Sequence, residues 1–103
     1  MSDYSFPYKD AAFLINDVLD FDQMCLDAGQ EDVNGEFASA VLEEAGRLGS
    51  EVLAPLNSVG DELGAKLEQD GVHETPGFAE AYRQYVDNGW ASLSGEEQYG
   101  GQA

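Results

Sequence analysis

Length, composition and charge limit what this chain can be. Its 103 residues suffice for one small domain with a modest core. With 21 acidic and only 4 basic residues, a formal net charge of -17 disfavours nucleic acids, nucleotides, coenzyme A and anionic membranes as partners of these residues.

The chain begins with a segment that we expect to be extended. Pro7 restricts the preceding Phe6 to β or polyproline geometry. Tyr4, Phe6 and Tyr8 alternate along residues 1–9, which favours a strap laid over a core.

Two short helices are expected next. Asp10 is predicted to cap the first helix. The apolar residues of this helix recur at the spacing of one helical face: Ala11, Leu14, Ile15, Val18 and Leu19. The second helix is expected from Asp22 to about Ala28, and Gly29 is expected to close it as a C-cap glycine.

The third helix is predicted to be the longest, with Asn34 as its N-cap. Its apolar residues form one stripe: Phe37, Ala38, Val41, Leu42, Ala45, Leu48, Val52, Leu53 and Leu56. Gly46 and Gly49 weaken a helix, so we expect a neighbouring helix to approach closely there.

A proline interrupts this helical pattern. Pro55 should kink the helix or end it near Ala54, and the continuing apolar residues favour a kink. Gly60 or Gly64 should then stop the helix.

A hairpin and a last helix follow. Residues 66–75 resemble a β-hairpin with a two-residue turn at Asp70-Gly71, and strands this short are expected to lie on the helices. Thr75 is the predicted N-cap of the last helix, Pro76 its first residue and Gly89 its end. The predicted fold class is mainly α: three to four helices and one short β-hairpin.

The chain offers few residues for catalysis or metal binding. His73 is the only histidine, so no pair of histidines can hold a metal, and we interpret it as a surface residue of the hairpin. Cys25 lies among apolar residues, so we interpret it as a core residue, and no spacing supports a dyad with His73. A lone cysteine forms no intrachain disulfide, which suits a reducing cytoplasm. The start of the chain lacks the features of a signal peptide.

The acidic residues do not form a calcium loop. Residues 20–25 lack the third ligand and the central glycine, and residues 27–32 have Gly29 in the wrong order. Gly100-Gly101 alone is more typical of a turn than of a phosphate-binding loop. We therefore assign no catalytic, cofactor-binding or metal-binding residue in this chain.

The aromatic residues near the end of the chain have two interpretations. Tyr82, Tyr85 and Trp90 could stack on a ligand or line an apolar channel. The spacing of the two tyrosines is equally that of a helix face packed in a core, which is the more common arrangement.

An ordered series of short motifs resembles the N-terminal region of the acyl-CoA dehydrogenase family. Leu53-Ala54-Pro55-Leu56 and Tyr99-Gly100-Gly101 are the most specific, and residues 13–20 are similar to the N-terminal extension of some bacterial members. The other matching stretches are residues 41–45, 51–57, 59–62, 67–72, 75–78, 81–83, 89–90 and 97–102. The resemblance thus covers nearly the whole chain.

This resemblance implies a division into an extension, residues 1–33, and a helical domain, residues 34–103, that is truncated at residue 103. Enzymes of the family bind FAD and oxidise the Cα–Cβ bond of an acyl-CoA thioester. Their catalytic base and most flavin contacts belong to later domains, so the chain alone is expected to be inactive and to hold no FAD. The implied partners are the remaining domains, a second copy in a homo-oligomer, and an electron-transferring flavoprotein.

The charge also supports a second hypothesis. A stand-alone acidic helical module could bind a basic protein partner through its carboxylates. A dense carboxylate surface is equally typical of solubility or adaptation to salt, and these interpretations are compatible.

Overall fold

The computed structural model describes residues 4–103, and the first three residues of the expected strap lie outside this range. The described chain is mainly α-helical with one antiparallel hairpin, as predicted. It divides into two compact units, residues 1–54 and 55–103, which we describe separately. Within residues 4–103, no helix is long and apolar enough to cross a membrane.

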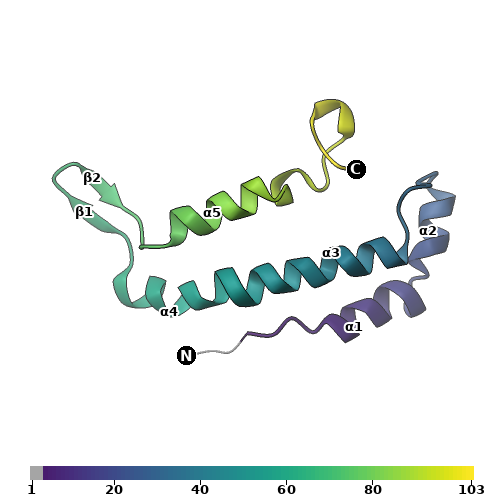
Figure 1. Ribbon diagram of the computed structural model, residues 1–103, viewed down its shortest axis with the longest axis horizontal. Coiled ribbons are helices and arrows are strands. Elements are labelled where there is room, and N and C mark those ends of the chain that lie inside the picture. The colour runs from purple at the N-terminus through teal and green to yellow at the C-terminus, as the bar shows by residue number, and fades with distance from the viewer. Residues whose placement is uncertain (1–3) are drawn as a thin grey trace. The chain divides into compact units, whose positions relative to one another are not determined.

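The first unit contains short helical segments and most of one long helix (Figure 1). The helical elements, in chain order, are α1 (Tyr8–Phe13), the π-helical η1 (Leu14–Val18), α2 (Phe21–Asp27), α3 (Gly35–Leu48) and the π-helical η2 (Gly49–Leu53). Helix α1 lies alongside α3 (Figure 1).

Asp10 does not cap α1, contrary to the prediction. The residue before the helix is Pro7, at φ -75°, and its carbonyl accepts a hydrogen bond from the Ala11 N–H at 3.1 Å. A proline needs no N–H partner at a helix start, so the helix can begin directly after it. Asp10 instead lies in the first turn, where a carboxylate interacts favourably with the helix dipole.

Hydrogen bonds to side chains define the corner between α2 and α3. Asp20 has a left-handed backbone and accepts a hydrogen bond from the Gln23 N–H, so α2 begins one residue earlier than expected. The Asn34 side chain accepts from the Phe37 N–H at 2.8 Å, which confirms it as the N-cap of α3. The Gly35 N–H donates to Asp22 Oδ1 at 2.6 Å, which ties the two helix starts together.

Gly46 of α3 and Gly49 of η2 accommodate the N-terminal strap and not a neighbouring helix, which corrects the prediction. A Cβ at Gly46 would lie 3.0 Å from the Phe6 Cβ, and one at Gly49 would lie 3.0 Å from Tyr4 Cε1. The expected strap therefore lies on the first unit's long helix. The close approach is made by two aromatic side chains, because an extended segment presents alternate residues to one side.

The helix does not end near Ala54 but continues through Pro55. The proline ring would clash with the carbonyl of Glu51 in a regular α-helix. Residues 49–53 instead form a π-helical turn, whose wider hydrogen-bonding pattern accommodates the proline. Helix α4 (Ala54–Leu63) then ends before Gly64, at φ +60°, so Gly64 and not Gly60 stops it.

The second unit contains α4 beyond its first residue, the hairpin and α5 (Phe78–Asp87). A Cβ at Gly60 would lie 2.8 Å from Phe78 Cζ, and one at Gly77 would lie 2.8 Å from Leu56 Cδ2. The absence of side chains at these two glycines therefore lets the start of α5 approach α4.

The hairpin turn lies one residue earlier than predicted. Strand β1 (Lys66–Glu68) pairs with β2 (Gly71–His73) in the register Leu67↔Val72 and Glu68↔Gly71. The two turn residues are therefore Gln69 and Asp70, and Gly71, at φ +130°, is the first residue of β2.

The hairpin does not bury its apolar residues on the helices, contrary to the prediction. Leu67 is 82% exposed and Val72 is 70% exposed. The two strands of the hairpin are therefore paired with each other, but the apolar face of the hairpin is not buried in this structure.

Thr75 does not cap the last helix. Gly77 takes φ +94°, a conformation that a helix cannot include, so α5 starts only at Phe78. The Phe78 N–H donates to the Thr75 carbonyl at 3.1 Å across this turn, and Thr75 is buried. Gly89, at φ +81°, follows the end of α5, as predicted.

The last residues fold back on the turn that follows α5. Two 3-10 helices, η3 (Trp90–Ser92) and η4 (Glu97–Tyr99), form this turn. Gln102 Nε2 donates to the Gly89 carbonyl at 2.7 Å, and the Ala103 N–H donates to the Gly95 carbonyl at 2.9 Å. A Cβ at Gly101 would clash with the backbone of Gly95, so this closure requires glycine.

Burial is slight in both units. Among the described residues, only two hydrophobic ones are buried, Cys25 in the first unit and Ala81 in the second. Large apolar side chains of both units remain largely exposed, including Leu14, Val18, Leu26, Phe37, Leu67, Val72 and Tyr82. The apolar stripes predicted from the sequence therefore exist, but the described chain covers them only in part.

Candidate functional site

The structure places the only cysteine and the only histidine in different units. Cys25 is 6% exposed on α2, as expected for a small core side chain. His73 lies on β2 at the surface, as its interpretation as a hairpin residue predicted.

Three of the four aspartates in the two rejected calcium windows have structural partners. Asp20 caps α2, Asp22 accepts from the Gly35 N–H, and Asp27 Oδ1 accepts from Gln23 Nε2 at 2.8 Å. These hydrogen bonds begin or extend helices, so they account for three of the carboxylates without a metal.

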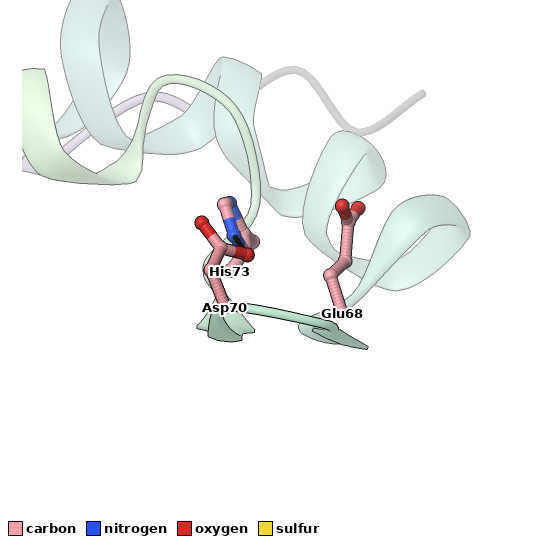
Figure 2. A group of neighbouring side chains, drawn as sticks. All are labelled: Glu68, Asp70 and His73. Carbon is pink, nitrogen blue, oxygen red and sulfur yellow. Dashed lines mark hydrogen bonds and ion pairs between the residues drawn. The ribbon is translucent and has the colours of Figure 1, made fainter.

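One cluster of potential metal ligands lies on the hairpin (Figure 2). Glu68, Asp70 and His73 each offer one ligand atom within 4.8 Å of the others. His73 Nε2 lies 2.7 Å from Asp70 Oδ1, and all three side chains are exposed. Two oxygens and one imidazole nitrogen are a donor set that divalent metals accept.

The sequence analysis did not anticipate this cluster, although its register could have revealed it. Glu68 pairs with Gly71, so side-chain alternation places Glu68 and His73 on the same face of the hairpin. The turn then brings Asp70 beside His73. Exposed carboxylates beside a histidine are common on protein surfaces, so the cluster alone assigns no metal.

The aromatic residues suggested as stacking groups do not converge on a described pocket. Tyr82 is 69% exposed and Tyr85 is 37% exposed on α5, and Trp90 begins η3. Their surfaces are available to another polypeptide or a ligand, and both interpretations from the sequence stay open.

The basic residues give little support for a phosphate site. Arg47 forms an ion pair with Glu44, and Arg83 Nη1 lies 3.0 Å from Glu80 Oε2. Gly100, at φ +90°, belongs to the turn that ends η4, as expected for a turn glycine. Every described aspartate and glutamate is exposed, so the surface repels phosphate groups.

Fold and surface define a small, mainly α-helical segment with one hairpin and uncovered apolar faces. No family model matches this chain. It is 38% identical over 98 residues to the 3-methylmercaptopropionyl-CoA dehydrogenase of Ruegeria pomeroyi. This similarity confirms the resemblance to an acyl-CoA dehydrogenase that the motifs indicated. The matched residues make up 95% of this chain but only 17% of that relative.

Proposed function

We propose that this chain is the N-terminal helical part of a flavin-dependent acyl-CoA dehydrogenase that oxidises the Cα–Cβ bond of an acyl-CoA thioester. The observation that carries the proposal is the 38% identity over 95% of the chain to a dehydrogenase of which it covers only 17%. The residues that perform the reaction would then lie in the rest of such a protein.

The flavin is not expected to bind these residues alone. FAD carries a pyrophosphate, which proteins usually hold with basic side chains or with the N–H groups of a glycine-rich loop. The four basic residues of the chain are outnumbered by 21 acidic ones, and both arginines are engaged with glutamates. The residues present therefore do not fit this cofactor, and we derive no catalytic step from them.

The role proposed for this chain is to cover and support the catalytic domains. Its uncovered apolar side chains provide the area for such packing. The proposed partners are the remaining domains, a second copy of the full-length enzyme and an electron-transferring flavoprotein, and the proposed location is the cytoplasm.

The test begins with the coding sequence that follows residue 103. We expect an open reading frame whose full-length product retains FAD and dehydrogenates 3-methylmercaptopropionyl-CoA or another acyl-CoA with an artificial electron acceptor. The isolated chain should leave flavin fluorescence unchanged. A full-length product that neither retains flavin nor oxidises any acyl-CoA would refute the proposal.

A stand-alone module that binds a basic protein is the alternative function, favoured by the exposure of every described carboxylate. It predicts salt-sensitive binding of the chain to a basic polypeptide such as polylysine, at a defined stoichiometry. A stop codon after residue 103 would favour this alternative, whereas a continuing reading frame would favour the dehydrogenase.

A further inference from the structure

The β1–β2 hairpin has one apolar and one polar face. Leu67 and Val72 are directly opposite across the strands, so they share one face. Lys66, Glu68 and His73 share the other. Leu67, at 82%, and Val72, at 70%, are the two most exposed large aliphatic residues among residues 4–103.

The apolar face of this hairpin lacks the cover that such a hairpin normally needs. A two-stranded hairpin is at best marginally stable in water, and its stability normally depends on packing of its apolar face. Both strands here are only three residues long. The exposed Leu67–Val72 pair therefore marks a face that needs a covering surface.

We propose that the Leu67–Val72 face docks on polypeptide of the same dehydrogenase that lies outside these 103 residues. This inference rests on the proposed function. The matched relative is about six times as long as the matched segment, so most of such an enzyme is available to cover the hairpin. The polar face, with Lys66, Glu68 and His73, then remains in solvent.

Charge argues against a second copy of this segment as the occupant. Each copy has a formal net charge of -17. Glu68, Asp70 and Glu74 flank the apolar pair closely in sequence and are exposed. The acidic surfaces of two copies would therefore repel each other, which is unfavourable for the docking of one hairpin on another.

A basic partner is likewise a poorer match for this face. The positive groups of a basic partner would be attracted to carboxylates. The apolar face consists of Leu67 and Val72 and carries no carboxylate. An apolar surface surrounded by polar residues instead matches the packing expected between parts of one protein.

The experiment compares the full-length enzyme with its Leu67→Ser/Val72→Ser variant by hydrogen exchange over residues 66–73. We expect exchange at least about tenfold faster in the variant, because loss of the covered apolar face promotes local opening of the hairpin. Equal exchange rates in the two proteins would overturn the proposal.

Two double variants of the full-length enzyme identify the face. Leu67→Ser with Val72→Ser should lower the melting temperature of the flavin-bound enzyme by several degrees, whereas the matched control, Lys66→Ser with Glu68→Ser, should change it little. If the apolar double variant is expressed only as insoluble protein while the control folds, the single variant Leu67→Ala is measured against Lys66→Ala.

The two proposals can fail separately. An active flavoenzyme with an exchange-labile hairpin and equally stable double variants would refute docking and leave the proposed function intact. A stop codon after residue 103, or a full-length protein without flavin and activity, would refute the proposed function together with this inference.

Discussion

The contact between the strap and α3 predicts that the effect of Gly46→Ala on stability depends on one aromatic residue, Phe6. Gly46→Ala improves helix propensity by about 1 kcal/mol. Its new Cβ, however, would lie 3.0 Å from the Phe6 Cβ, closer than ordinary contact. Because that atom is fixed to the backbone of the strap, relief requires the strap to move, and overpacking of this kind costs about 1–3 kcal/mol.

The two effects separate in a double-mutant cycle. In the natural chain, Gly46→Ala should be neutral or destabilise by up to about 2 kcal/mol. In a Phe6→Gly background the close contact is gone, so the same change should stabilise by about 1 kcal/mol. The coupling between the two positions is then about 1–3 kcal/mol.

Urea unfolding followed by far-UV circular dichroism measures these free energies. Ala40→Gly, the reverse change at an exposed position of α3, is the control for helix propensity. It should destabilise both backgrounds equally, by about 1 kcal/mol. If Gly46→Ala stabilises both backgrounds by the same amount, the strap does not lie on α3 and the reasoning is wrong.

Three further predictions concern a cap, the charge and the C-terminal turn. Asn34→Ala should destabilise by about 1 kcal/mol in urea unfolding and Asn34→Asp by much less; equal effects would exclude capping. Raising NaCl from about 0.1 to about 1 M shortens the Debye length from roughly 10 to 3 Å, so the melting temperature should rise; a constant value would show that carboxylate repulsion is negligible. Gly101→Ala should clash with Gly95 and speed amide exchange at Gln102 and Ala103, whereas unchanged exchange would contradict the closed turn.

The elements that the sequence predicted correctly depend on local chemistry. Asn34 caps α3 through a hydrogen bond to a residue three positions away. Gly64 and Gly89 follow helix ends because their positive φ values exclude a continuing helix. Such signals lie within a few residues of one another, so they can be read without knowledge of the tertiary fold.

The sequence-based predictions were wrong where a distant segment determines a contact or where a single backbone angle determines the position of a turn. Nothing near Gly46 and Gly49 indicates that a strap and not a helix approaches them. Similarly, Gly71 fits either a turn or a strand, and the observed register moved the turn by one residue.

The group of potential metal ligands on the hairpin likewise could not be recognised from local sequence alone. Each of Glu68, Asp70 and His73 is an ordinary surface residue in the sequence, and only strand pairing brings their donor atoms within 4.8 Å. The apolar pair Leu67 and Val72 could be predicted from alternation, but its exposure depends on what the rest of the structure covers.

The burial of Cys25 makes it a natural reporter of motion in the first unit. It is the only thiol in the chain, and it lies on α2, where only 6% of its surface is accessible. A thiol reagent such as DTNB must therefore wait for that region to open, and its rate of labelling measures how often opening occurs. Since the second unit contributes no thiol, the signal would be specific to one half of the molecule without any engineered label.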